Sequence, residues 1–129
     1  MGDPQLLARI DDAHRRACSA EHELVQLCAE IDRTGTWRDD GARDAAHWLA
    51  MRFGVSLWKA RRWIAAGKEL PVLPALSDAF EAGRLGVDKV VELTRFAEPD
   101  TEAVLKFSDR TKQGRLGILR TLMIALTRA

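Results

Sequence analysis

Apolar residues recur every three or four positions along the first third of the chain. They form a stripe along one helix face, with two polar interruptions: Leu7, Ile10, His14, Ala17, Glu21, Leu24, Cys28 and Ile31. Asp3 followed by Pro4 is typical of a helix start, because aspartate caps free backbone N–H groups and proline fits the first helical position. The spacing predicts one long helix over residues 1–34, ending before Gly35.

A second helical unit is predicted over residues 44–67. Asp44 can cap a short helix over residues 45–53, Gly54 can make the turn, and Ser56 can cap the next helix. Gly67 followed by Pro71 matches the pattern that ends a helix. Two short helices joined through a glycine have the spacing of a helix-turn-helix.

Further short helices are predicted over residues 74–129. One over residues 74–82 is closed by Gly83, the next is ended by Pro99, another begins at Asp100, and the apolar segment LGILRTLMIAL closes the chain. No alternating strand pattern appears. The sequence predicts a single all-α domain over residues 1–129, a helical bundle with a long N-terminal helix and a helix-turn-helix unit.

The helical period divides the 44–67 unit into an inner and an outer side. A helix-turn-helix needs a small residue where its helices cross, a glycine in the turn and apolar residues between the helices. Ala50 is the small residue, and the predicted inner residues are Leu49, Phe53, Val55, Ala60, Trp63 and Ile64. The predicted outer residues of the second helix are Leu57, Trp58, Arg61, Arg62 and Ala65, with Lys59 at the margin.

The outer side suggests contact with nucleic acid. Arginine side chains suit phosphates and guanine edges. Leu57 and Trp58 can contact thymine methyl groups, stack on an extruded base or anchor another protein. The candidate DNA-binding residues are Ser56, Leu57, Trp58, Lys59, Arg61 and Arg62, supported by Arg52 and by Arg115 or Arg120. A plain corner in a helical bundle is the alternative interpretation.

The net charge of +1 conceals an uneven distribution. Residues 45–69 carry 5 basic and 1 acidic side chains, and residues 106–129 carry 6 and 1. Positive charge concentrated on two segments is typical of a protein that meets a polyanion. It therefore indicates a polyanionic partner, although a charged face is more often simply solvated. The partner that we expect is DNA, in duplex form.

Several classes of enzyme are excluded by composition. The chain contains no tyrosine and no asparagine, which excludes a tyrosine recombinase or topoisomerase nucleophile and a His-Asn-His nuclease site built with its asparagine. His47 has no nucleophile with an orienting acid beside it in the sequence, and no Gly-rich phosphate loop occurs. We expect no catalytic site, no cofactor and no small-molecule substrate.

The histidines and cysteines of the first helix do not predict a metal site. His14, Cys18 and His22 are spaced by four residues. The outer two would lie about 12 Å apart along the axis, whereas zinc bonds are about 2 Å long. Cys18 and Cys28 would be about 15 Å apart, too far for a disulfide.

Membrane and secretion signals are absent from the sequence. No apolar run approaches the ~20 residues of a membrane span, and the first residues lack a basic start followed by an apolar core. Reduced thiols suit a cytosolic protein. The expected location is the cytoplasm, with no membrane partner.

Five short motifs occur in a fixed order between residues 45 and 97. They are Trp48-Leu49-Ala50, Gly54-Val55-Ser56, Ala60-Arg61-Arg62, Leu73-Pro74 and Gly83-Arg84-Leu85. In this order they resemble the actinobacterial 13E12 repeat family, also called domain of unknown function 222. Gly86 departs from the serine usual in the family, so the following helix should be capped more weakly. Many family members carry a separate His-Asn-His endonuclease domain, so the resemblance implies a nucleic-acid context without a nuclease site in this chain.

Two functions are compatible with these patterns. The first is a DNA-binding domain of helix-turn-helix type without its own catalytic site. The alternative is a helical protein-protein interaction or dimerisation module that uses the stripe of the first helix, the pair Leu57 and Trp58, and the apolar last helix. Because these apolar faces exceed what a small bundle easily hides, we expect a homodimer.

Overall fold

The computed structural model describes residues 2–98, and this part of the chain is all-α. Its elements are α1 (Pro4–Thr34), the 3₁₀ helix η1 (Thr36–Asp40), α2 (Ala45–Phe53), α3 (Leu57–Glu69), the 3₁₀ helix η2 (Leu70–Val72), α4 (Pro74–Glu81) and α5 (Val87–Leu93). No strand occurs among the described residues. The all-α prediction is confirmed, and the helices predicted after Pro99 lie outside the described residues.

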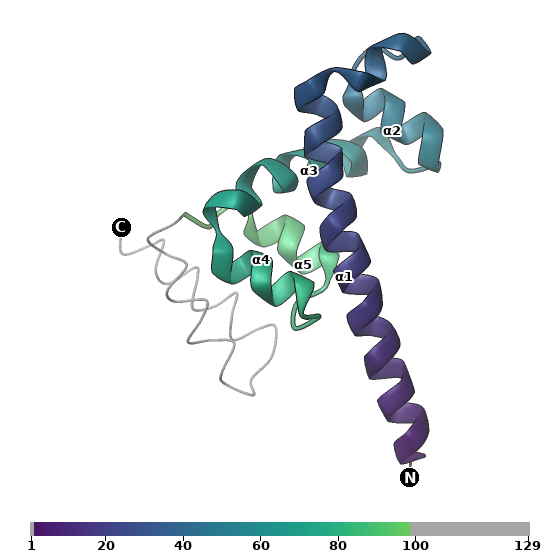
Figure 1. The fold of residues 1–129 in the computed structure, drawn as a ribbon, viewed down its shortest axis with the longest axis vertical. Helices are drawn as coiled ribbons and strands as arrows, with labels where there is room; N and C mark the ends of the chain where they lie inside the picture. Colours follow the sequence, from purple (N-terminus) through teal and green to yellow (C-terminus); the bar gives the residue numbers. More distant parts are fainter. Residues whose placement is uncertain (1, 99–129) are drawn as a thin grey trace.

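The long helix α1 begins and ends as the sequence predicts. The side chain of Asp3 accepts a hydrogen bond from the backbone N–H of Gln5 at 2.9 Å, and Pro4 is the first helical residue. Gly35 ends the helix with φ 71°, a left-handed conformation that glycine adopts without strain. In Figure 1 the N-terminal part of α1 extends beyond the other helices, and residues 4–17 are all exposed.

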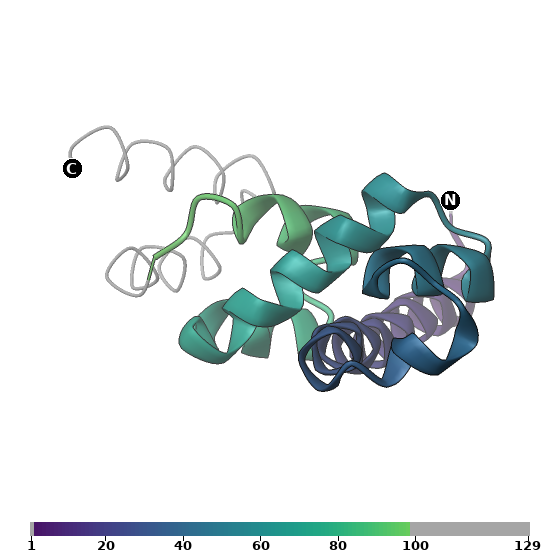
Figure 2. The same cartoon turned by 90° about the horizontal axis from the view of Figure 1, so that it is seen from above.

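The other helices pack on the second half of α1. Figures 1 and 2 show α3 lying across α1, with α2 on one side of the crossing and α4 and α5 on the other. The core between them contains apolar side chains from every α-helix; its largest fully buried members are Phe80, Leu49, Leu70, Leu73, Leu76, Leu93, Val25 and Val90. This packing fixes which side of α3 stays in solvent.

Only the C-terminal part of the stripe predicted for α1 contacts the core. The buried residues of α1 are Cys18, His22, Val25 and Cys28, whereas Leu7 and Ile10 are more than half exposed. The line of residues that packs against α3 and α4 is a neighbouring one, which includes Cys18, His22 and Val25. The N-terminal members of the predicted stripe are therefore in solvent, whereas Leu24, Cys28 and Ile31 contact the core.

The end of α3 also differs from the prediction. The helix continues through Gly67 to Glu69, and Gly67 is buried. A Cβ atom at this position would lie 2.8 Å from the Cβ of Ala29, so glycine allows α1 and α3 to approach closely. The glycine serves the helix crossing, whereas the sequence pattern had suggested a helix end.

Candidate nucleic-acid interface

The α2–α3 unit is built from local signals that the sequence contains. The carboxylate of Asp44 accepts a hydrogen bond from the N–H of His47 at 2.8 Å and begins α2. Gly54 ends α2 with φ 69°, and the Ser56 hydroxyl accepts from the N–H of Lys59 at 3.0 Å to begin α3. The two helices and their caps agree with the prediction for this unit.

The inner side of this unit agrees with the prediction at most positions. Ala60, Trp63 and Ile64 are buried, as is Leu49 of α2. Phe53 was predicted to face inward but is 47% exposed. It lies at the last turn of α2, with its ring at an edge-to-face angle to Trp48 and the centroids 6.5 Å apart. The packing that buries Leu49 does not reach the end of this short helix.

The outer side of α3 presents an aromatic ring and two guanidinium groups. Trp58 is 66% exposed, and the Cζ atom of Arg62 lies over its ring at 4.8 Å from the centroid. Arg61, one position before Arg62, is exposed. Among residues 2–98 no carboxylate forms an ion pair with either arginine. Trp58, Arg61 and Arg62 together are called the α3 outer face below.

The other residues predicted to bind DNA, Ser56, Leu57 and Lys59, do not lie on the α3 outer face. Ser56 uses its hydroxyl as the helix cap, and Leu57 is half-buried. Lys59 lies toward α1: its Nζ is 5.2 Å from the centroid of the Trp63 ring. Burial raises the pKa of Glu21 of α1, and the positive charge of Lys59 partly opposes this rise. Lys59 therefore contributes positive charge near α3 without sharing the α3 outer face.

Two basic residues that were not among the sequence candidates lie next to the α3 outer face. A pocket of about 400 Å³ between α3 and α5 is lined by Arg62, Ala65, Lys68, Glu69, Val91, Thr94 and Arg95. The Nζ of Lys68 is 2.6 Å from Asp32 Oδ2, so Asp32 offsets its charge. The Nε of Arg62 is buried and has no hydrogen-bond partner among the described residues. Arg95 is distant from Arg62 in sequence, and only the packing of α5 against α3 places both on one pocket.

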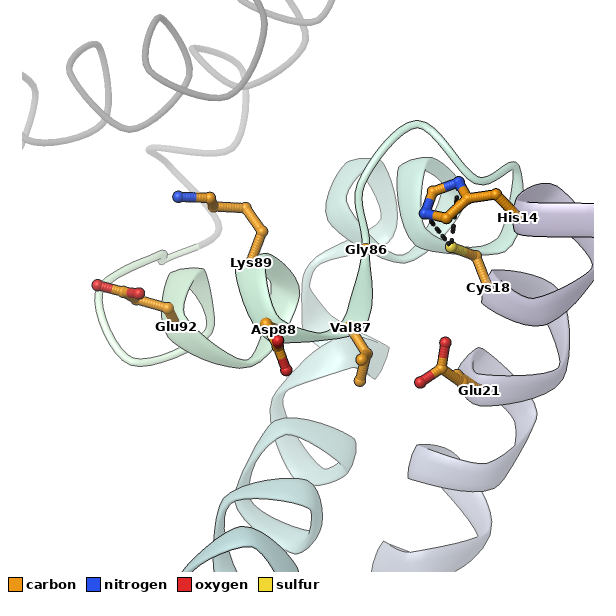
Figure 3. A pocket seen from close by; sticks show the side chains of 8 residues that line it. All are labelled: His14, Cys18, Glu21, Gly86, Val87, Asp88, Lys89 and Glu92. Carbon is orange, nitrogen blue, oxygen red and sulfur yellow. Dashed lines mark hydrogen bonds between the residues drawn. The ribbon is translucent and has the colours of Figure 1, made fainter. Parts of the chain in front are cut away.

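A second pocket, on the other side of α5, is dominated by acidic groups. Figure 3 shows His14, Cys18 and Glu21 of α1 lining it together with Asp88, Lys89 and Glu92 of α5. Its volume is about 440 Å³, and Cys18 Sγ lies 3.5 Å from His14 Nε2. Burial, and next the charge of Asp88, raise the pKa of Glu21. Three carboxylates make this surface unfavourable for a phosphate backbone.

The histidine–cysteine series of α1 does not converge on one point. His14 and Cys18 line the acidic pocket, whereas His22 Nε2 lies 2.7 Å from the Ser77 hydroxyl of α4. The His22 ring also contacts Phe80 edge-on, with centroids 5.5 Å apart. No group of three or more metal-binding side chains that could hold an ion occurs within residues 2–98. His22 is thus a hydrogen-bonded core residue.

The fold and this surface define an all-α domain built on one long helix crossed by a two-helix unit with a basic outer side. The chain belongs to the family described as domain of unknown function DUF222, whose model matches residues 5–116. This finding confirms the family resemblance of the five motifs. No curated protein and no solved structure matches the chain. None of the described helices has both the length and the apolar character needed to span a membrane.

Proposed function

We propose that this chain is a cytoplasmic DNA-binding domain of helix-turn-helix type that contacts duplex DNA through α3. The observation that carries the proposal is the α3 outer face, where an exposed tryptophan lies beside two arginines without a carboxylate partner among the described residues. Arginine binds phosphate oxygens and guanine edges through the same planar fork.

The start of α3 adds to this electrostatic preference. Its first turn contains no acidic residue, although acidic side chains are stabilising at that position of a helix. Ser56 caps the N–H of Lys59, and the other N–H groups of this turn, with the positive end of the helix dipole, favour an anion. Arg52 at the end of α2 adds a further charge, with its Cζ 5.0 Å from the centroid of the Trp48 ring.

The proposed activity is binding without cleavage. The candidate face holds a ring and guanidinium groups, which bind DNA but supply no nucleophile or general base. The isolated chain should leave supercoiled plasmid intact in the presence of Mg²⁺, Mn²⁺ or Zn²⁺. Nicking that follows the protein peak through a second purification would contradict this part of the proposal.

The DNA proposal is tested by binding measurements over a series of salt concentrations. Fluorescence anisotropy with labelled duplex should show affinity that falls as salt rises, because cations are released from the phosphates. The double variant Arg61→Ala, Arg62→Ala should bind more weakly, with a slope of log K against log salt reduced by about one for each lost phosphate contact.

A matched control removes the same charge elsewhere. Arg15 and Arg33 are exposed on α1, where they pair with Asp12 and Glu30 respectively. The double variant Arg15→Ala, Arg33→Ala should retain the wild-type salt slope. Equal slopes for wild type and the α3 variant, or the absence of salt-sensitive binding by wild type, would overturn the proposal.

A protein-protein interaction module is the second candidate function. Met51 is 56% exposed, Phe53 47% and Trp58 66%, and all three lie on the α2–α3 unit. Exposed aromatic and methionine side chains are typical of protein interfaces. Trp58→Ala separates the two functions: it should weaken duplex binding if α3 reads DNA, and it should weaken only association with protein if the unit is an interaction surface.

A further inference from the structure

An apolar stripe runs along the whole of α1, and it lies on a different side of the helix from the face that the domain buries. Its residues alternate at spacings of four and three: Leu6, Ile10, Ala13, Ala17, Ala20, Leu24, Leu27 and Ile31. All eight are apolar, and the repeat of seven residues is the pattern of a coiled coil, with these residues at its a and d positions. This set is called the α1 seam below.

Most of the α1 seam is in solvent. Leu6 is 57% exposed, Ile10 61% and Leu27 53%, and the three alanines are exposed as well. Leu24 and Ile31 are half-buried, because they also pack against the edge of the core. The buried face of α1, centred on Cys18, His22 and Val25, points in a different direction. The N-terminal part of α1 that carries Leu6 and Ile10 extends beyond the other helices in Figure 1.

We propose that the α1 seam binds the α1 seam of a second copy of this chain in an antiparallel two-helix coil. The charges beside the seam select this occupant and its direction. On one side of the seam, the flanking positions recur every seven residues and are occupied by Arg9, Arg16, Glu23 and Glu30. Two basic residues are thus followed by two acidic ones, all exposed.

An antiparallel twofold arrangement matches these charges. Corresponding flanks face each other in an antiparallel coil, so Arg9 lies beside the partner's Glu30 and Arg16 beside the partner's Glu23. Each pair occurs twice because the arrangement is symmetric. Flanking charges of this kind set the orientation of coiled coils.

A parallel arrangement lacks this match. It would place the Arg9 flank against the opposite flank of the partner helix, which consists of Leu7, His14, Glu21 and Cys28. In that register Arg9 lies beside the partner's His14 and Glu23 beside the partner's Cys28. Only Arg16 meets an opposite charge, that of the partner's Glu21. A parallel pair therefore forms one kind of opposite-charge contact, whereas the antiparallel pair forms two.

The antiparallel register also pairs seam residues of suitable size. Leu6 lies opposite the partner's Ile31, and Ile10 lies opposite the partner's Leu27. Ala17 lies opposite the partner's Ala20 near the twofold axis, between residues 18 and 19. Small residues at the centre let the helix backbones approach closely, and large ones at both ends bury apolar area. The seam extends over about 38 Å of helix.

The ion pairs within α1 do not prevent its flanking charges from pairing with those of the partner. Arg16 Nε lies 2.9 Å from Asp12 Oδ2, and Arg33 pairs with Glu30. Both pairs are exposed, and such pairs contribute little to stability. The α1 seam shares no residue with the α3 outer face, so this proposal stands independently of DNA binding.

The first test measures the mass of the full chain by sedimentation, as a function of concentration. The wild type should form a dimer of twice 14.4 kDa. The double variant Arg9→Glu, Arg16→Glu places like charges opposite one another and should raise the dimer Kd by about tenfold or more, since like charges at these positions oppose pairing. Adding Glu23→Arg and Glu30→Arg to the same chain restores four opposite-charge pairs and should restore the dimer.

Control variants distinguish a lost interface from a lost fold. All four flanking residues are exposed, so each variant should keep the helical circular dichroism and melting temperature of its monomer. Ile10→Glu with Leu27→Glu should give a folded monomer in the same way. A monomeric wild type at 100 μM would overturn the proposal, and so would a dimer whose Kd is unchanged by both the charge and the seam variants.

The second test measures direction. A spin label on Gln5→Cys can be attached selectively, because Cys18 and Cys28 are buried. In the antiparallel coil, residue 5 of each copy lies at the opposite end, so the two labels should be about 40 Å apart. In a parallel pair the labels would be only about 10–15 Å apart, which is the distance between neighbouring helices plus the label length. Such a short separation would overturn the proposal.

Discussion

Gly67 of α3 and Ala29 of α1 lie so close that a Cβ atom on the glycine would be 2.8 Å from the Cβ of the alanine. The same atom would come even closer to the backbone carbonyl oxygen of Val25. The backbones of α1 and α3 are therefore in near contact at their crossing. This contact positions α3, and with it the α3 outer face.

Gly67→Ala should destabilise the domain. The added methyl group has no space, and overpacking of this kind costs about 1–3 kcal/mol, which exceeds the ~1 kcal/mol that alanine gains over glycine inside a helix. Urea unfolding followed by circular dichroism measures the difference. Ala65→Ser, on the exposed side of the same helix, serves as the control and should change stability by less than about 0.5 kcal/mol. A Gly67→Ala variant as stable as wild type would show that the two helices do not approach so closely.

Helix boundaries were predictable wherever the signal is local. Asp3, Asp44 and Ser56 cap helices because an aspartate or serine side chain reaches the N–H groups that follow it. Gly35 and Gly54 end helices because they adopt positive φ. Each of these effects involves neighbours in the sequence, so the sequence alone determines it.

Packing between distant helices was less predictable. Gly67 followed by Pro71 has the pattern of a helix end, and nothing near it in sequence reveals that Ala29 lies opposite. Along α1 the predicted stripe and the α1 seam share four residues, Ile10, Ala17, Leu24 and Ile31. Neither contains His22 or Val25, which the domain buries. A helix with several apolar stripes does not determine which of them its own domain covers.

In the candidate site, too, the local features were predictable from the sequence and the contacts between distant helices were not. Once Ala60 and Trp63 are assigned to the inner side of a helix, the outward positions of Trp58 and Arg61 follow from the period of 3.6 residues. The position of Lys59 near Glu21 does not follow, because it depends on the packing of α1 against α3. Arg95 enters the neighbouring pocket only through the packing of α5 on α3.

The two tryptophans of α3 should respond oppositely to truncation. Trp63 is 8% exposed and belongs to the core, whereas Trp58 is 66% exposed. Trp63→Ala should lower the free energy of unfolding by about 3–5 kcal/mol, and Trp58→Ala should change it by less than about 0.5 kcal/mol. Chemical denaturation of both variants under identical conditions measures this. Similar losses for the two variants would show that α3 is rotated relative to the arrangement described.

The thiol of Cys28 should be unreactive while the domain is folded. Burial raises its pKa to about 11, and the thiolate is the nucleophilic form. In a Cys18→Ala variant at pH 8, alkylation by iodoacetamide should be slow in buffer and fast in denaturant. The rate in the folded state should rise as the pH approaches 11. Equal rates with and without denaturant at pH 8 would show that Cys28 is accessible.

Glu21 should make the domain less stable at neutral pH than a neutral side chain would. Burial and the nearby Asp88 raise the pKa of this carboxyl above its ordinary value of 4.5, and the charges of Lys59 and His14 act in the opposite direction. The folded state thus holds the proton more tightly than the unfolded state does. The resulting stabilisation is present below the unfolded-state pKa and is lost as the pH rises through the folded-state pKa.

Glu21→Gln should consequently be more stable than wild type at pH 7, and this difference should shrink as the pH falls below about 4.5. Asp12→Asn provides a control of opposite sign, because hydrogen bonds from Arg16 and Arg15 lower the pKa of Asp12. That variant should be less stable than wild type at pH 7, and its difference should also vanish in acid, as the carboxyl is protonated. Thermal unfolding from pH 3 to pH 8 measures both trends. A Glu21→Gln variant that is destabilised at pH 7, or a difference that is independent of pH, would show that the ionised carboxylate is not disfavoured beside Asp88.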